Sequence, residues 1–255
     1  MSKIYLEAYG DEQVKTLVMI HGWGMHSGVW RLFARDLSQH CRVICVDLPG
    51  HGHSQSITDF SLANISASLI AEIPVKQFSV LGWSLGGMVA IDMASRYPER
   101  IKSLLVLAGN PKFVAAEDWP GIRLEVLENF AQQLALDSQQ TLLRFLSLQV
   151  QGMANVKPLL QEIKQAVLSS PVASKAALQA GLDILRDEDL RPAFQALSCP
   201  ISVIIGNKDP LVPEQLLSAM QLLQPQAHSV SLSGAGHVPF LTHQASLLAE
   251  VLKGL

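Results

Sequence analysis

The chain has few cysteines, and the three it has are not arranged as a metal site or a disulfide framework. Cys41, Cys45 and Cys199 are odd in number and lack the paired spacing of metal ligands. Small disulfide-stapled and zinc-stapled folds are therefore excluded. We expect buried, reduced thiols in a cytoplasmic protein.

Charge and long apolar runs are also scarce. Charged residues make up 16% of the 255 residues, and the formal net charge is -3. Without a basic excess the chain has no electrostatic reason to bind nucleic acid or an anionic membrane surface. No stretch approaches the roughly 20 apolar residues of a membrane span, and residues 1–10 lack the basic and apolar regions of a signal peptide. We expect a soluble, unexported protein that binds neither nucleic acid nor a membrane.

What the chain does have is a set of short apolar runs, each ended by a loop rich in Gly, Asn, Asp or Pro. The runs are residues 16–21, 42–47, 78–81, 103–107 and 201–205. Helical periodicity separates them, so the sequence predicts an α/β fold with a mostly parallel central sheet flanked by helices. Ligands bind such sheets at the carboxyl ends of the strands.

Residues 111–187 interrupt this alternation. They are rich in Leu, Gln and Ala, have helical periodicity, and are long enough for about four short helices. We predict a helical cap inserted before the next strand of the sheet. The core domain would then comprise residues 1–110 and 188–255, with the cap at 111–187.

The strongest catalytic motif lies at residues 78–87, F-S-V-L-G-W-S-L-G-G. A strand-like run leads into G-x-S-x-G and then into a helix, which is the order of a nucleophile elbow. Small residues are needed around a serine held in such a strained turn. We predict that Ser84 is the nucleophile and that the Leu85 amide donates to an oxyanion.

Two further loops follow strand-like runs. H-G-W-G at residues 21–24 would supply the second oxyanion donor from the Trp23 amide, with the indole as a pocket wall. D-L-P-G-H-G-H-S at residues 47–54 predicts a rigid loop beside the cleft. Its His51 and His53 have no third ligand at useful spacing, so we interpret them as loop residues and expect no metal or organic cofactor. His21 is expected to have a structural hydrogen-bonding role.

The acid and the base should follow the serine in that order. Asp209 comes directly after the strand-like residues 201–206, whereas the competing position after residues 103–107 carries Asn110. His237 lies in the glycine-rich loop at residues 233–240. We predict Asp209 as the acid and His237 as the base. Three other carboxylates are interpreted as solvated: Asp183, Asp187 and Asp189. Two other histidines near the end of the chain are interpreted as structural or exposed: His228 and His243.

Within the cap, R-F-L-S-L-Q at residues 144–149 places Phe145, Leu148 and Gln149 on one helical face, together with Gly152. Such a face fits an acyl-chain tunnel and fits packing of the cap on the core equally well.

Together with W-P-G-I at residues 119–122, these motifs resemble the pimeloyl-acyl-carrier-protein methyl ester carboxylesterases of the α/β-hydrolase superfamily. The resemblance implies a triad of Ser84, Asp209 and His237, and a monomer that acts on a carrier-bound ester and on small surrogate esters. It also implies a substrate site lined by the triad serine and histidine together with seven other residues, Trp23, Leu85, Phe145, Leu146, Ser147, Leu148 and Gln149. Two positions depart from the family pattern, His53 and Gln140.

The expected reaction is hydrolysis of the methyl ester in biotin synthesis through an acyl-enzyme. Two alternatives remain at this point: another α/β-hydrolase acting on small esters, thioesters or carbon-carbon bonds of dienoates, and a non-catalytic binding module of the same fold. A dehalogenase is disfavoured because its nucleophile is an aspartate where Ser84 stands.

The charge of the cap suggests how a carrier would bind. Residues 138–182 contain four basic residues and one acidic residue. This segment therefore has a formal charge of +3, whereas the whole chain has a net charge of -3. An excess of this sign would steer an acidic acyl carrier protein. We predict Arg144 and Lys157 as docking residues.

Overall fold

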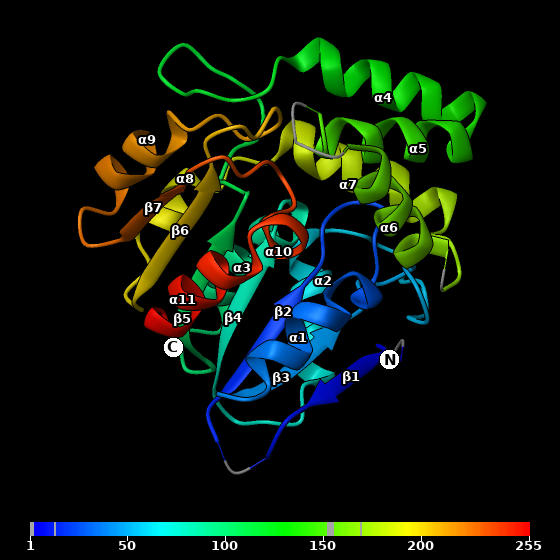
Figure 1. Cartoon of the computed structure of the whole chain (residues 1–255). Coiled ribbons are helices and arrows are strands. Elements are labelled where there is room, and N and C mark those ends of the chain that lie inside the picture. Colours follow the sequence, from blue (N-terminus) through cyan, green and yellow to red (C-terminus); the bar gives the residue numbers. More distant parts are fainter. Residues whose placement is uncertain (1–2, 13, 152–155, 169) are drawn as a thin grey trace.

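The chain folds around one central sheet with helices on both faces and a further group of helices above the carboxyl ends of the strands (Figure 1). The structure is a computed structural model that describes residues 3–12, 14–151, 156–168 and 170–255.

The sheet has seven strands in the order β1-β3-β2-β4-β5-β6-β7. All neighbours run parallel except β1, which pairs with β3 antiparallel. The strand bounds are β1 Leu6–Tyr9, β2 Thr16–Ile20, β3 Arg42–Val46, β4 Phe78–Trp83, β5 Ile101–Leu107, β6 Ile201–Gly206 and β7 His228–Leu232.

Burial explains why the inner strands read as apolar runs. Every residue of β2, β3, β4 and β6 is buried, because helices cover both faces of this part of the sheet. On one face α1 packs beside α11, and on the other α3 packs between α2 and α8. The core helices are the 3₁₀ helix η1 Ser27–Trp30, then α1 Arg31–Leu37, α2 Leu62–Glu72, α3 Leu85–Arg96, α8 Arg191–Gln195, α9 Leu216–Leu223, α10 Pro239–Thr242 and α11 Gln244–Lys253.

Five helices lie between β5 and β6 in the described part of the chain, and the first four form the group above the strand ends in Figure 1. They are α4 Leu124–Leu136, α5 Ser138–Gln149, α6 Val156–Leu168 and α7 Lys175–Asp187. Side-chain caps begin two of them: Asp137 accepts from the Gln140 amide, and Ser174 accepts from the Ala177 amide. We call α4 to α7 the cap helices.

The predicted α/β fold with a mostly parallel sheet is confirmed, and so is the helical character of the segment before β6. The domain limits at 110/111 and 187/188 remain a prediction. The edge strand β1 was not predicted, and neither were two isolated β-bridges that close the W-P-G-I loop, Val114–Ile122 and Ala116–Trp119. Within the described part of the chain, no helix has the length and apolar character needed to cross a bilayer.

Candidate active site

Ser84 lies at the sharp turn between β4 and α3, in a conformation that few residues adopt. It has φ 57° and ψ -121°, and it is 2% exposed. A non-glycine residue held there costs about 1–3 kcal/mol, which the surrounding structure must offset. The turn therefore has the strained geometry of a nucleophile elbow.

Two glycines allow the chain to pack this tightly around Ser84. A Cβ on Gly82 would lie 2.1 Å from the Gly86 carbonyl oxygen, and a Cβ on Gly86 would lie 2.5 Å from the carbonyl oxygen of Ile20. Both distances are far shorter than atoms tolerate. The G-x-S-x-G pattern thus has a steric cause in this fold: strand β2, the elbow and α3 approach one another at backbone contact.

His237 and Asp209 form a buried pair on the loops after β7 and β6. His237 Nδ1 lies 2.8 Å from Asp209 Oδ2, and neither side chain is exposed to solvent. The other carboxylate oxygen accepts hydrogen bonds from the amides of Leu211 (2.8 Å) and Val212 (3.0 Å). Because the carboxylate can only accept here, Nδ1 carries the proton and Nε2 is the basic nitrogen.

His237 Nε2 is buried and has no hydrogen-bond partner among the described residues. The loop that carries it is held against the elbow by Trp83, whose indole Nε1 donates to the His237 carbonyl oxygen at 2.8 Å. The Trp83 and His237 rings lie 5.6 Å apart. Residue 83 immediately precedes Ser84, so the elbow and the base are fixed to one another, and a free basic nitrogen lies in the site.

Trp83 was not predicted to have a positioning role. The signal available was its place inside the motif, and nothing in the sequence indicates which loop its indole reaches.

The two predicted oxyanion donors lie beside Ser84. Leu85 is the first residue of α3, so its amide has no partner within the helix. On the other side, a Cβ on Gly22 would lie 3.1 Å from Ser84 Cβ, which brings the loop of Trp23 next to the serine. The positive end of the α3 dipole also points at this position.

The Trp23 side chain joins the core to the cap helices. It is fully buried, and its Nε1 donates to the Leu178 carbonyl oxygen of α7 at 2.8 Å. Its ring meets that of Phe145 edge-on, with 4.9 Å between centroids. Phe145 in turn packs edge-on against Phe130 of α4 at 5.7 Å, a residue that was not predicted to belong to the site.

The five cap residues predicted to line the substrate site fall on two faces of α5. Phe145, Leu146 and Gln149 are buried. The other two, Ser147 and Leu148, line a pocket between α4 and α5 on the outer side of the cap, and Ser147 is exposed. The structure therefore does not place Leu148 on the same face as Phe145 and Gln149, and Gly152 lies outside the described residues.

Gln149 has an unusual environment. It is 0% exposed, and neither its Oε1 nor its Nε2 has a hydrogen-bond partner among the described residues. An amide buried without partners costs roughly 1–3 kcal/mol for each unpaired group. Such a side chain is suited to a bound molecule that supplies the missing partners.

The histidines outside this pair have mainly structural surroundings. As predicted, His21 makes structural hydrogen bonds: Nε2 accepts from the Leu48 amide at 2.9 Å, and Nδ1 lies 2.8 Å from the Gly22 carbonyl oxygen. Burial, together with the neighbouring His51, lowers the pKa of His21 to about 3, and burial lowers the pKa of His51 to about 4. Both are neutral at pH 7.

The remaining candidates are exposed. His53 is exposed on its loop, and His228 pairs with Glu250 on the surface. Asp183 and Asp187 pair with Arg186 in partly or fully exposed positions. The two predicted docking residues, Arg144 and Lys157, are both exposed; Arg144 Nη1 donates to Gln133 Oε1 at 3.1 Å.

Comparison with known proteins gives a family match, named relatives and similar solved structures. Residues 15–244 match the family described as the alpha/beta hydrolase fold. The chain is 39% identical over 252 residues to a protein of Klebsiella pneumoniae (strain 342) named pimeloyl-(acyl-carrier protein) methyl ester esterase, covering 99% of this chain and 97% of the relative. A relative of the same name from Edwardsiella ictaluri (strain 93-146) is 41% identical over 251 residues, with coverage of 98% and 96%.

Among solved structures, an esterase from Exiguobacterium antarcticum superimposes with a TM-score of 0.88 at 21% identity, over 99% of this chain and 95% of that one. A likeness at this identity concerns the fold.

Proposed function

Because this chain belongs to the α/β-hydrolase fold family, together with relatives named pimeloyl-(acyl-carrier protein) methyl ester esterase, we propose that it is a serine carboxylesterase that hydrolyses the methyl ester of pimeloyl-acyl carrier protein. The products are pimeloyl-acyl carrier protein and methanol, in biotin synthesis. The observation that carries the reaction class is the buried His237–Asp209 pair with its free Nε2, on a loop that Trp83 holds against the strained turn of Ser84. The substrate rests on the near full-length similarity to the named relatives.

The proposed mechanism has two halves. In the first, His237 Nε2 takes the Ser84 hydroxyl proton while Oγ attacks the ester carbonyl carbon, and the carbonyl oxygen gains the negative charge. The amides of Trp23 and Leu85 would hold this oxyanion. The carbon-oxygen bond to the methoxy group then breaks, and His237 gives its proton to the leaving methanol.

In the second half, water replaces methanol. His237 takes a proton from the water, the hydroxide attacks the acyl-enzyme, and Ser84 leaves with that proton. Asp209 orients the imidazole throughout and stabilises its charged form. Every proton is returned, so this chain's own residues suffice for the cycle.

The carrier is proposed to dock on the basic side of the cap. Arg144 is exposed and bonds the neutral amide of Gln133, and within the described part of the chain no carboxylate pairs with it. A guanidinium free of an internal carboxylate can pair with one on an acidic partner. Lys157 is exposed at the start of α6 and would add to the attraction.

We also propose that the enzyme works as a monomer in the cytoplasm. Cys41 and Cys45 are free and buried, and burial raises the pKa of both thiols, that of Cys41 to about 11. Thiols in this state are unreactive and suit a reducing compartment.

The decisive experiment measures which bond is cut. The purified protein is incubated with the methyl ester of pimeloyl-acyl carrier protein, and methanol and free carrier thiol are both quantified. We expect methanol without free thiol. Release of the thiol would instead indicate a thioesterase, and no release of either by a protein active on short esters would indicate another α/β-hydrolase. In cells, expression should restore biotin-independent growth to a strain that lacks the demethylating step.

A further inference from the structure

Two apolar stripes of the cap face a common space, one on α5 and one on α6. On α5 the stripe holds Leu142, Leu143 and Leu146, at the three- and four-residue spacing that places helical side chains on one side. On α6 it holds Val167 and Leu168. Both stripes line a pocket of about 180 Å³, which we call the α5–α6 pocket.

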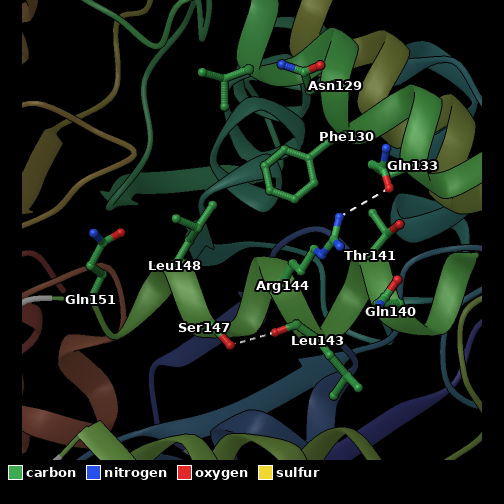
Figure 2. Close-up of a pocket in the computed structure, with 11 residues that line it drawn as sticks. Asn129, Phe130, Gln133, Gln140, Thr141, Leu143, Arg144, Ser147, Leu148 and Gln151 are labelled. Carbon is green, nitrogen blue, oxygen red and sulfur yellow. Dashed lines mark hydrogen bonds between the residues drawn. The ribbon is translucent and has the colours of Figure 1, made fainter.

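The α5–α6 pocket is separate from the site of the proposed reaction. None of the proposed catalytic or docking residues lines it, and of the residues predicted to line the substrate site only Leu146 reaches it. The Leu143 side chain points away from Phe130 of α4, which borders the other pocket of the cap (Figure 2). At the inner end Leu142 meets the core, because a Cβ on Gly24 would lie 2.6 Å from Leu142 Cδ1. The loop after β2 therefore closes the pocket at this end.

The only charged side chain among the lining residues is that of Lys164, which precedes the apolar stripe of α6 by one turn. Lys164 is partly buried, and within the described part of the chain no carboxylate pairs with its ammonium group. A single polar group in an apolar pocket fixes the orientation of a ligand. A partly buried cation without an internal partner is suited to an anionic group on that ligand.

The volume and the lining limit the ligand to a slender molecule with one anionic end. Sites for drug-sized ligands have volumes of about 300–1,000 Å³, which exceeds the volume of this pocket. Six apolar side chains line it, and two of them, Leu168 and Val172, are 72% and 46% exposed. Contact with an alkyl chain would remove this apolar surface from water.

We propose that the α5–α6 pocket is a binding site for an unesterified carboxylic acid with a medium-length alkyl chain. The carboxylate lies at Lys164, and the chain lies between the apolar stripes of α5 and α6 and extends toward Leu142. This site is distinct from the one that binds the ester at Ser84. The inference goes beyond the proposed function and does not depend on it.

The expected affinities follow from the contacts. Each methylene group that is buried adds a factor of about four in affinity. A charge pair that is partly open to solvent adds a few-fold, which salt reduces. The affinity should therefore rise steeply with chain length until the chain fills the pocket, and a carboxylate should bind a few-fold more tightly than an alcohol of the same chain length.

The test titrates the full-length protein with butyrate, hexanoate, octanoate and 1-octanol by isothermal titration calorimetry. In the wild-type protein we expect saturable binding of octanoate, with an affinity about tenfold or more above that of hexanoate. We expect 1-octanol to bind a few-fold more weakly than octanoate at low salt, and the difference to shrink at high salt.

Two variants alter the pocket, and each has a matched control. Val172→Trp places an indole at the pocket and should lower the affinity for octanoate about tenfold or more; Val14→Trp makes the same change at a position of nearly equal exposure, 45% against 46%, outside the lining. Lys164→Gln should remove the preference for octanoate over 1-octanol. Lys76→Gln removes an exposed lysine outside the lining and should keep that preference.

Hydrogen exchange locates the bound acid. Saturating octanoate should slow exchange of the α5 and α6 amides more than that of the α9 amides, because the ligand packs between the first two helices. Circular dichroism spectra of the four variants show whether each has kept its fold. If Val172→Trp does not fold, Lys164→Gln and the exchange pattern still decide the matter.

The outcomes separate this inference from the proposed function. The site is overturned if the wild-type protein shows no saturable binding of octanoate. It is also overturned if Lys164→Gln keeps the full preference for the carboxylate and Val172→Trp binds octanoate as Val14→Trp does, since the acid would then bind elsewhere, for example at the ester site. An esterase that fails these tests keeps its proposed function, and a protein that binds octanoate in this way but cleaves no ester keeps the site.

Discussion

At the scale of single residues, three of the predicted site residues depart from ordinary packing rules. Ser84 has a strained backbone, His237 Nε2 is buried without a partner, and Gln149 is an unpaired buried amide. Each of these costs stability in the free protein. A bound ester offers a purpose for all three, because it supplies an electrophile to the serine, a proton path to the histidine and polar groups to the amide.

Ser84→Ala should remove esterase activity and preserve the fold. Loss of the nucleophile leaves only the oxyanion donors and binding, so kcat on a short p-nitrophenyl ester should fall by about 10³-fold or more. Initial rates together with the circular dichroism spectrum check this. A well-folded variant with near-normal turnover would disprove the role of Ser84.

Asp209→Asn should cost about 10²- to 10⁴-fold in kcat, because an amide at this position allows the wrong tautomer of His237. The matched control is Asp187→Asn, which removes a carboxylate that pairs with Arg186 in an exposed position. Its kcat should stay close to the wild-type value. The opposite order of effects in a steady-state assay would place the acid elsewhere.

His51 predicts a pH dependence of stability. Burial lowers its pKa from 6.5 to about 4, so between these pH values the unfolded chain binds a proton on residue 51 that the folded chain does not. The free energy of unfolding therefore falls as the pH is lowered through this window, by up to about 1.4 kcal/mol per pH unit from this group. In His51→Gln the free energy of unfolding should fall less steeply with decreasing pH, by the contribution of about one proton.

Urea unfolding at pH 7, 6 and 5 measures this slope. His40→Gln serves as the control, since His40 is exposed. Equal slopes for wild type and His51→Gln would show that the buried ring is not held neutral.

At the scale of elements, the sequence indicated the inner strands but not the edge strand. β2 to β6 are apolar runs because nearly all of their residues are buried; in β5, Lys102 is exposed. β1 is only partly buried, and it exists because Leu6 to Tyr9 pair with Val46 to Val43 of β3. That pairing joins distant segments, and no local pattern encodes it.

The rotation of α5 about its own axis likewise could not be predicted from the sequence. Apolar residues occupy two sides of this helix: Leu142 and Leu146 are buried, whereas Leu143 is 42% exposed and Leu148 lines the outer pocket. A helix with two apolar sides has no single inward face, so contacts with α4 and α6 decide its rotation. The triad candidates were easier to locate in the sequence, because each lies just after a strand-like apolar run.

The basic side of the cap should matter only for the carrier-bound substrate. Arg144→Glu reverses a charge that would pair with an acidic carrier, so KM for the carrier-bound ester should rise several-fold, with little change for a free short ester. Added salt should raise the wild-type KM for the carrier-bound ester in the same direction, since exposed charges are screened beyond about 10 Å at 0.1 M.

Lys76→Glu is the matched control for this charge reversal. Lys76 is exposed and precedes β4, at the end of the sheet opposite Ser84. Steady-state kinetics of both variants on both substrates, at low and high salt, give the answer. An equal loss of kcat/KM on the two substrates would mean that the basic surface of the cap does not bind the carrier. A KM for the carrier-bound ester that does not change with salt would mean the same.

At the scale of the whole molecule, the cap helices are attached to the core by hydrogen bonds to two core loops, the loop after β2 and the loop after β3. Trp23 Nε1 donates to Leu178 O at 2.8 Å, Ser174 N donates to Gly50 O at 2.9 Å, and His26 Nε2 lies 3.2 Å from Val167 O. Both loops lie at the carboxyl ends of strands. The same loops shape the site, so the stability of the cap and the geometry of the site are physically linked.

Trp23→Phe should loosen the cap without loosening the sheet. Phenylalanine keeps an aromatic ring against Phe145 but removes the indole donor to Leu178, a loss of about 1 kcal/mol from the attachment of α7. Local opening of α7 should then become about fivefold more frequent, and hydrogen exchange of its amides should accelerate by that factor. Amides of β2 and β4 exchange through global unfolding, so any common shift there reports the change in overall stability.

Trp119→Phe is the control, because Trp119 Nε1 donates to Lys112 O within its own loop. Uniform acceleration in α7, β2 and β4 would show that cap and core open as one unit.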